Sequence, residues 1–339
     1  MLEVKNLKVN LDTSGGIVKA VDGVSFTVEA GQTVGIVGES GSGKSVLAQS
    51  VMQLNPEPPV YYPQGDIQFE GRSLLNMNKR EIRKIRGKDI AMIFQDPMSS
   101  LNPVFKIGAQ LIEAIRTHQD SLRKDAEKKA IELLSDVGIP DPERRMHEYP
   151  HQFSGGMRQR VLIAIALACK PKLLIADEPT TALDVTIQAQ ILSLMKHIQN
   201  KYGMAIIIIT HDLGVVANLA DKLLVMYSGR IVEEGSVNDI FYRTSMPYTW
   251  SLLRSLPRLD SQANGRLLSI QGQPPNLISP PEGCNFHPRC PFASSKCLEA
   301  DPVLTERGEE HYAACILSKA DIDEKKQQID VAEQKGVTP

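Results

Sequence analysis

The chain has 339 residues, 42% of them hydrophobic, and a formal net charge of −2. This length exceeds one typical domain, and the nearly balanced charge excludes the basic footprint that nucleic-acid-binding proteins carry. The longest apolar runs, 161–169 and 204–209, are too short to span a bilayer. Residues 1–5 show the pattern of a strand, so no signal peptide is expected in these residues. We therefore expect any membrane association to come through protein partners.

The N-terminal part leads into a phosphate-binding loop. Residues 1–32 are mostly strand-like, the β-branched run 33–37 predicts a buried strand, and a helix is expected over 45–54. Between strand and helix lies a full G-x-x-x-x-G-K-S motif, formed by Gly38, Glu39, Ser40, Gly41, Ser42, Gly43, Lys44 and Ser45. Its glycines let backbone N–H groups face phosphates, while Lys44 adds a positive charge and the Ser45 hydroxyl can ligate Mg²⁺.

Residues 56–94 are expected to contain two strands and a helix, and the pattern then becomes helical. A proline-rich loop at 56–63 precedes expected elements at 66–69 (strand), 78–86 (basic helix) and 89–94 (strand). From about 97 to 167 the pattern is helical, with main pieces at 108–117 and 122–137. Within this block Ser154, Gly155 and Gly156 precede an apolar helix, so they offer a hydroxyl and bare N–H groups at a helix start.

Two carboxylates end the following strand. The apolar run 172–176 is short enough for a central parallel strand, and Asp177 and Glu178 come directly after it. Beside a phosphate loop, Asp177 is expected to hold Mg²⁺ through water, and Glu178 to orient or deprotonate the attacking water. Another strand, over 205–209, places His211 at a strand's carboxyl end, where open α/β sheets bind ligands.

The C-terminal third becomes loop-rich and holds most of the cysteines. Expected elements are a helix at 186–201, a strand at 221–227, a terminal hairpin, and short helices at 238–243 and 248–256. Four of the five cysteines cluster as Cys284, Cys290, Cys297 and Cys315, whereas Cys169 is expected in the core. In a cytoplasmic protein such a cluster favours a metal over disulfides, and thiolates alone suit either Zn²⁺ or an iron–sulfur cluster.

Six motifs in a fixed order resemble those of ATP-binding cassette (ABC) ATPases, the motor subunits of ABC transporters. In chain order they are residues 38–45 (Walker A), Gln95 (Q-loop), Ser154, Gly155, Gly156 and Met157 (signature), Asp177 and Glu178 (Walker B and catalytic glutamate), Ala182, Leu183 and Asp184 (D-loop) and His211 (switch histidine). The resemblance implies ATP hydrolysis between two cassettes arranged head to tail, each signature capping the partner's ATP. It also implies catalytic roles for Glu178, His211 and Gln95, and Mg²⁺ ligation by Ser45, Gln95 and Asp177.

The chain departs from the family pattern at two positions. The family usually stacks adenine on an aromatic residue upstream of the phosphate loop, but residues 1–24 contain no Tyr, Phe or Trp. Leu11 lies in that region, so we expect adenine to rest on aliphatic side chains there. The signature carries Met157 where many cassettes have Gln, a position that the family tolerates.

Residues 95–103, 149–153, 283–291 and 311–315 resemble a narrower group, the ATPases of oligopeptide/dipeptide importers, and its D-type subunit most closely. This resemblance implies a sister ATPase and two membrane permeases as partners, an extracytoplasmic substrate-binding protein reached indirectly, and no nucleic acid. The implied location is peripheral, on the cytoplasmic face of the cell membrane. Some members of the group carry a [4Fe–4S] cluster on the equivalent cysteines, so a cluster is expected here, with Zn²⁺ or free thiols as alternatives.

The expected fold is α/β. Residues 1–256 are expected to form a P-loop ABC-type nucleotide-binding domain: a RecA-like mixed sheet, an N-terminal antiparallel β part, and an inserted helical subdomain at about 97–167. A small cysteine-rich extension of the oligopeptide-importer type is expected at 257–317. The charged, apolar-poor tail at 318–339 is expected to be disordered.

Several functions remain open from the sequence. The first is the ATP-hydrolysing motor of a di- or oligopeptide importer, with nickel or another small solute as an alternative cargo. The second is a soluble, non-transport cassette, but the tandem cassettes or coiled-coil inserts usual in that class do not fit this length. The third is a cluster-bearing sensor without turnover, and the intact Lys44, Asp177, Glu178 and His211 argue against it.

Overall fold

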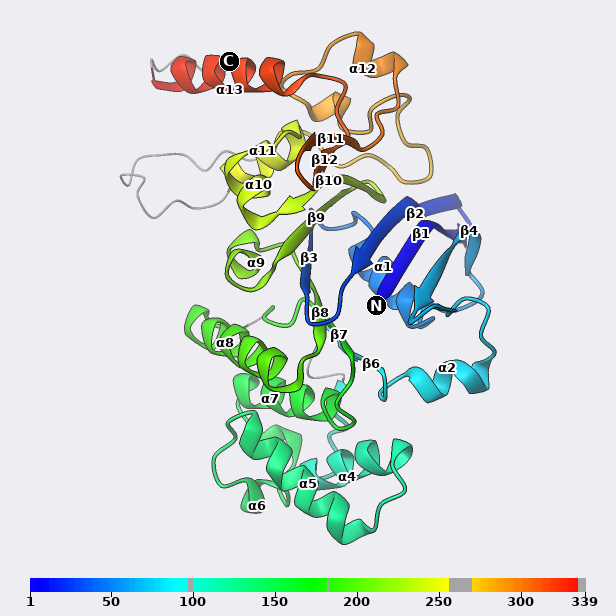
Figure 1. Ribbon diagram of the computed structural model, residues 1–339, viewed down its shortest axis with the longest axis vertical. Coiled ribbons are helices and arrows are strands. Elements are labelled where there is room, and N and C mark those ends of the chain that lie inside the picture. Colours follow the sequence, from blue (N-terminus) through cyan, green and yellow to red (C-terminus); the bar gives the residue numbers. More distant parts are fainter. Residues whose placement is uncertain (97–99, 182, 256–269, 335–339) are drawn as a thin grey trace.

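The computed structural model describes residues 1–96, 100–181, 183–255 and 270–334 (Figure 1). The expected domain boundary at 256/257 and D-loop residue Ala182 lie outside these ranges. The described residues form two sheets, and helices pack around them. No helix among them is long and apolar enough to cross a membrane.

The main sheet has the order β11-β12-β10-β9-β3-β8-β7-β6. Five parallel strands make its centre: β9 (Lys222–Tyr227), β3 (Thr33–Val37), β8 (Ala205–Thr210), β7 (Leu173–Asp177) and β6 (Ile90–Ile93). Every residue of β3, β7 and β8 is buried, because helices cover both faces of a parallel sheet. β10 (Arg230–Ser236) adds on antiparallel to β9 through a tight turn at Gly229.

A second, antiparallel sheet forms the N-terminal part, as expected. Its order is β2 (Gly16–Val28), β1 (Leu2–Thr13), β4 (Val60–Phe69) and β5 (Arg72–Ser73). Helix α1 (Lys44–Val51) joins the two sheets in one apolar cluster. In this cluster lie Leu47 of α1, Val4 of the N-terminal sheet and Ile36 of the main sheet. Helix α2 (Lys79–Ile85) follows, with a capping box between Asn78 and Glu81.

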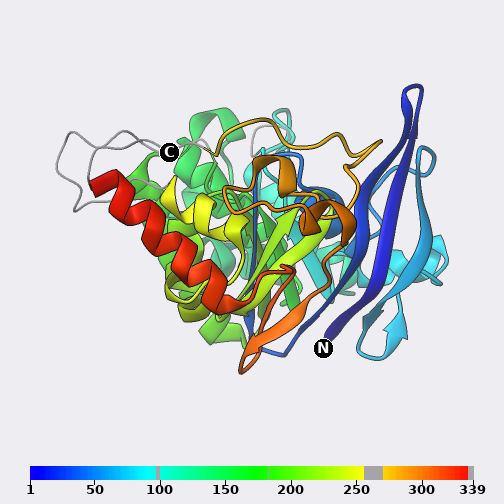
Figure 2. The same cartoon turned by 90° about the horizontal axis from the view of Figure 1, so that it is seen from above.

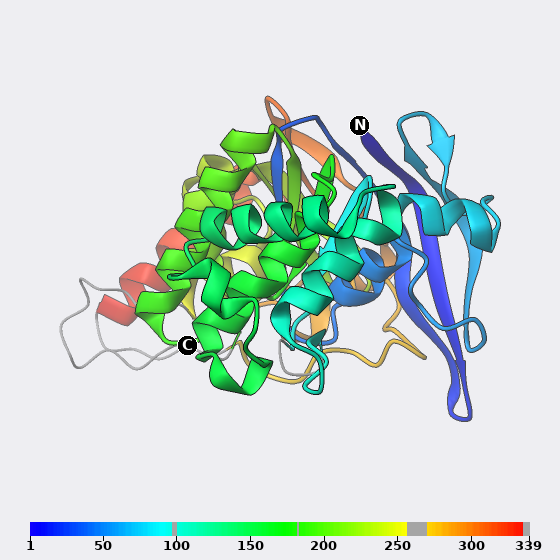
Figure 3. The same ribbon diagram turned by 90° about the horizontal axis from the view of Figure 1, so that it is seen from below.

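The helical part lies at the far end of the molecule from the C-terminal region (Figures 1 and 3). It contains α4 (Ile107–His118), α5 (Arg123–Asp136), α6 (Pro142–Arg145), the 3₁₀ turn η1 (Pro150–Gln152) and α7 (Gly155–Ala166). These elements fall within the expected subdomain at about 97–167. Helix α8 (Val185–Tyr202) connects β7 to β8, and α9 (Leu213–Leu219) connects β8 to β9. Helices α10 (Val237–Tyr242) and α11 (Pro247–Arg254) follow β10.

The C-terminal extension continues the main sheet. Its strands β11 (Thr305–Gly308) and β12 (His311–Ala313) form a hairpin, and β12 pairs antiparallel with β10. Its other elements are η2 (His287–Arg289), α12 (Lys296–Glu299) and α13 (Lys319–Gln334). Phe286 of the extension is buried in the main apolar cluster, so this segment shares the core of the cassette.

The expectation of a disordered tail is wrong for residues 319–334. They form helix α13, which lies beside α10 and α11 (Figure 2). The hydroxyl of Ser318 accepts from the Asp321 N–H at the helix start, and Ile322 is fully buried. Lys326 donates to the Thr244 carbonyl at 2.6 Å. One buried apolar side chain and these polar ties hold a helix whose composition alone argues for disorder.

Candidate functional site

The predicted phosphate loop follows β3 and opens α1. Gly38, Gly41 and Gly43 have φ values of 153°, 77° and 100°, which side-chain-bearing residues rarely adopt. A Cβ atom on Gly38 would lie 2.2 Å from the Met226 carbonyl oxygen, and one on Gly43 would lie 2.1 Å from that of Ala20. The chain therefore needs glycine at both positions to keep the loop against β9 and β2.

Lys44 lies beneath this loop and is 6% exposed. Its ammonium donates to the carbonyl oxygens of Gly38 at 2.8 Å and Glu39 at 2.9 Å. Burial lowers the pKa of Lys44, and the carboxylates of Glu178, Asp177 and Glu39 partly oppose that shift. The amine is thus held among the loop's own oxygens and next to the acidic strand end.

Asp177 and Ser45 meet where β7 ends beside α1. The Ser45 hydroxyl donates to Asp177 Oδ1 at 3.1 Å, and Asp177 is 4% exposed. Burial raises the pKa of Asp177, and so does the neighbouring Glu178, while the Ser45 hydrogen bond opposes the shift. One carboxylate and one hydroxyl beside a phosphate site match what Mg²⁺ takes from proteins, since it binds few side chains and keeps substrate phosphates and waters.

Glu178 receives contacts from three other side chains. Gln95 Nε2 donates to its carboxylate at 2.8 Å, Thr181 Oγ1 donates at 2.9 Å, and His211 Nδ1 lies 3.2 Å from it. Burial favours the protonated form, but the hydrogen bonds from Thr181 and His211 outweigh it and lower the pKa of Glu178. The structure therefore brings together three side chains predicted to be catalytic, and it adds Thr181, which the sequence reading missed.

The predicted signature lies at the start of α7. Ser154 caps this helix by accepting the Met157 N–H at 3.3 Å. A Cβ on Gly155 would lie 3.6 Å from Leu183, and one on Gly156 would lie 2.7 Å from Ile187, so the signature borders the D-loop and α8. Within the described residues, no hydrogen bond joins the signature to the phosphate loop. D-loop residue Asp184 caps α8 through the Ile187 N–H at 2.9 Å.

Leu11 lies on β1, opposite Val18 and Val60, and packs against the apolar cluster around α1. No described contact ties it to the phosphate loop. Its role toward adenine stays a prediction.

The four C-terminal cysteines lie in one part of the extension. Cys297 is buried and the other three are half-buried. Burial raises the pKa of Cys290 to about 12, and the charges of Cys315, Cys284 and Cys297 add to the shift, so these thiols lie within electrostatic reach of one another. Even so, the described residues contain no group of three or more His, Cys, Asp or Glu placed to hold a metal ion. The geometry does not support the expected iron–sulfur cluster or the zinc alternative.

Two long-range contacts to the phosphate loop were not foreseen from the sequence. The Glu39 N–H donates to the Tyr248 hydroxyl at 2.9 Å, and the Glu39 carboxylate accepts two hydrogen bonds from Arg289. These partners are separated by 209 and 250 residues in sequence, so no local pattern reveals them.

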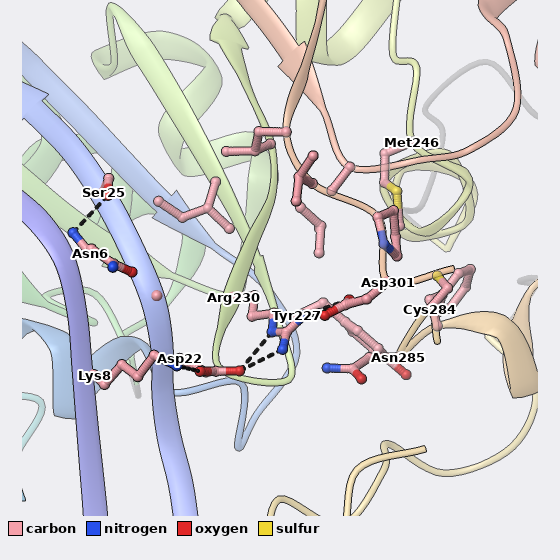
Figure 4. A pocket seen from close by; sticks show the side chains of 18 residues that line it. Asn6, Lys8, Asp22, Ser25, Tyr227, Arg230, Met246, Cys284, Asn285 and Asp301 are labelled. Carbon is pink, nitrogen blue, oxygen red and sulfur yellow. Dashed lines mark hydrogen bonds and ion pairs between the residues drawn. The ribbon is translucent and has the colours of Figure 1, made fainter. Parts of the chain in front are cut away.

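A pocket of about 480 Å³ lies where the N-terminal sheet, the β9–β10 hairpin and the extension meet (Figure 4). Arg230 lies in its wall, paired with Asp22 and Asp301 at 2.6 Å each. None of the residues that line it belongs to the predicted nucleotide site.

A mixed sheet with a phosphate loop after β3, an acidic pair at the end of β7 and a histidine after β8, together with the Ser-Gly-Gly start of α7, defines an ATPase of the ABC class. The ABC transporter family model matches residues 21–181, and the model of the oligopeptide/dipeptide transporter C-terminal region matches residues 232–297. The chain belongs to the family of ATP-binding subunits of ABC transporters that also contains the OppD and DppD proteins.

Relatives match along nearly the whole chain. The oligopeptide transport ATP-binding protein OppD of Bacillus subtilis (strain 168) is 53% identical over 321 residues, covering 95% of this chain and 90% of OppD. The dipeptide transport ATP-binding protein DppD of Lactococcus lactis is 53% identical over 314 residues, covering 92% and 89%. Among solved structures, a dimeric ATP-binding cassette bound to ADP and phosphate in a post-hydrolysis state is 26% identical, with a TM-score of 0.63 over 70% of this chain and 99% of that one.

Proposed function

We propose that this protein is the ATP-hydrolysing motor subunit of a membrane importer for di- or oligopeptides. The observation that carries the ATPase part is the convergence of Gln95, Thr181 and His211 on Glu178. The named relatives, at 53% identity over more than nine-tenths of the chain, support the peptide cargo.

The chemistry follows from the chain's own groups. Backbone N–H groups of the phosphate loop and the Lys44 ammonium bind the phosphates of ATP. A bound Mg²⁺, held by Ser45, Gln95 and Asp177, would offset charge on the phosphates. Glu178, whose lowered pKa keeps it ionised at neutral pH, orients the attacking water and accepts its proton. His211, whose Nδ1 lies 3.2 Å from Glu178 Oε1, would contact the γ-phosphate.

The partners in this proposal are a sister ATPase and two permeases, with a substrate-binding protein outside the membrane. Ser154, Gly155, Gly156 and Met157 would complete the sister's ATP site, because they lie at the start of α7 and, among the described residues, share no hydrogen bond with their own phosphate loop. The location would be peripheral, on the cytoplasmic face of the cell membrane, through the permeases.

Reconstitution of the whole transporter tests the proposal. The chain, its sister ATPase, both permeases and the binding protein are assembled in vesicles, and ATP hydrolysis is followed while peptides of increasing length or Ni²⁺ are supplied. We expect stimulation by di- or oligopeptides and none by Ni²⁺. Stimulation by Ni²⁺ alone would move the cargo to a metal ion, and hydrolysis unaffected by Lys44→Ala would reject the ATPase assignment.

We also propose that Cys284, Cys290, Cys297 and Cys315 bind one [4Fe–4S] cluster with a structural role, with Zn²⁺ as the alternative. The proposal rests on the thiol chemistry of these residues and on the electrostatic interactions among them, and not on a preformed metal site. Because no three of these described cysteines are placed to hold a metal ion, binding would have to draw the thiols together.

Metal analysis of the anaerobically purified protein decides this second proposal. A brown protein with about four irons per chain, lost in Cys290→Ser and retained in Cys169→Ser, is the expected result. One zinc per chain would replace the cluster by a zinc site. Absence of both metals would leave four free thiols.

A further inference from the structure

A side chain of the C-terminal extension is clamped onto the phosphate loop. Arg289 Nη1 donates to Glu39 Oε2 at 2.6 Å, and Nη2 donates to Glu39 Oε1 at 2.9 Å. This is a two-point fork between guanidinium and carboxylate, the strongest form of such a pair. The Arg289 side chain is only 4% exposed, so solvent screens the pair weakly.

Buried aromatic rings pack next to the Arg289–Glu39 ion pair. Phe286, three residues before Arg289, packs edge-on against Tyr227 and Tyr248 with ring centroids 5.3 Å apart in each case. Tyr248 accepts the Glu39 N–H, and Arg289 Nε donates to the Gln271 carbonyl at 3.0 Å. Backbone and side chain of Glu39 are therefore both fixed by groups that follow the cassette's core motifs in sequence.

The charge of Glu39 explains why such a clamp matters. Among the described residues, three carboxylates act on the Lys44 ammonium: those of Glu178, Asp177 and Glu39. Asp177 and Glu178 have proposed roles toward Mg²⁺ and water, whereas Glu39 places a negative charge within the loop that must receive the anionic phosphates of ATP. Arg289 cancels that charge at hydrogen-bond distance.

We propose that Arg289 is a positioning residue for ATP binding. By neutralising Glu39 and fixing its place in the phosphate loop, it makes the nucleotide affinity of the cassette depend on the C-terminal extension. This inference rests on the nucleotide site proposed above and adds a residue that none of the family's six motifs contains.

The test is an equilibrium titration of the full-length chain with AMP-PNP and Mg²⁺. We expect Arg289→Ala to weaken binding roughly tenfold, as one uncompensated charge near the phosphates would do at an intermediate dielectric constant. Arg289→Lys, which keeps the charge and loses the fork, should lose less. The Glu39→Gln/Arg289→Ala double variant, which carries neither charge, should bind within about twofold of the wild type, because the net charge at this place is again zero.

Further measurements separate this inference from its alternatives. Asp301→Asn weakens a second ion pair between extension and cassette, in which Arg230 Nη1 donates to both carboxylate oxygens of Asp301. It should leave Kd unchanged within about twofold. If the double variant binds as weakly as Arg289→Ala alone, the loss does not come from the charge of Glu39 and the proposal is overturned, as it is if Arg289→Ala causes no loss at all. If thermal unfolding shows that Arg289→Ala does not fold, Arg289→Gln, alone and together with Glu39→Gln, carries the comparison. Binding unaffected by Lys44→Ala would instead reject the nucleotide site itself.

Discussion

Glu178 adopts a backbone conformation that is costly for a residue with a side chain. Its φ is 49°, in the left-handed region, and its N–H donates to the Ile209 carbonyl of β8 at 2.8 Å. Such strain persists where surrounding structure holds it, and it concentrates at functional sites. Here the strain turns the carboxylate away from β7 and toward Gln95 and His211, whereas Asp177, one residue earlier, faces Ser45.

Replacing this carboxylate tests its role directly. We expect Glu178→Gln to reduce ATP hydrolysis by the assembled transporter by ~10²–10⁴-fold, because a positioned base is lost, while ATP stays bound. Phosphate release and retained nucleotide are the measurements. The matched control is Glu70→Gln, an exposed glutamate paired with Lys172, which should hydrolyse like the wild type. Normal turnover in Glu178→Gln would remove Glu178 from the mechanism.

Asp177 gives a prediction about stability and pH. Its pKa is raised in the folded state, mainly by burial, so the ionised side chain destabilises the fold. This cost is fully present above the raised folded pKa and disappears below the ordinary value of 3.8. Asp177→Asn should therefore raise the melting temperature of the nucleotide-free protein at neutral pH, and the gain should shrink as the pH falls. A lower melting temperature at neutral pH would contradict the burial argument.

At the scale of elements, a buried polar contact ties β12 to β10. Glu233 is fully buried and accepts from Thr244 Oγ1 at 2.7 Å, from the Ser245 N–H, and from His311 Nε2 across the strand pair at 2.9 Å. We expect His311→Ala to cost roughly 3 kcal/mol of unfolding free energy, because a buried carboxylate loses a partner. Chemical denaturation measures this. Adding Glu233→Gln should recover part of the loss, and an unchanged midpoint in His311→Ala would show that the contact contributes nothing.

Elements with a strong local signal could be predicted from the sequence. The strand at 33–37 coincides with β3, and the helix expected at 122–137 differs from α5 by one residue at each end. The hairpin β11–β12 and helix α13 were missed, because their stability comes from pairing with β10 and from burial of Ile322 against distant residues. Neither contribution leaves a periodic pattern in a short polar segment.

The residues of the candidate site also fall into those that a local motif predicts and those that only the fold brings together. Lys44, Asp177 and Glu178 stand in compact motifs whose spacing carries the chemistry, so the sequence identified them. Thr181 lies only three residues after Glu178 but outside the motif spacing, and Tyr248 and Arg289 reach the phosphate loop from more than 200 residues away, so no local pattern marks their contacts. The expected metal at the cysteines came from composition and resemblance, which cannot report whether thiols converge in space.

At the scale of the whole molecule, one chain is expected to be an incomplete enzyme. The signature at the start of α7 has no hydrogen bond to its own phosphate loop within the described residues. We expect weak ATPase activity from the isolated chain and a rise when the sister subunit is added. Ser154→Arg should abolish that rise, and the matched change Ser193→Arg, at an exposed position of α8, should not. Full activity of a monomer, independent of concentration, would rule out a shared site.

The pairing of β12 with β10 also determines where this protein can be cut. A truncation at residue 256 would follow the domain boundary that the sequence suggests. In this chain such a cut would remove β12 from the outer side of β10, so that Glu233 and Glu234 would lose their strand partner on that side while staying paired with β9. Bare strand edges recruit strands from other molecules. The shortened protein would consequently self-associate, and studies of the isolated cassette must retain the hairpin that seals its sheet.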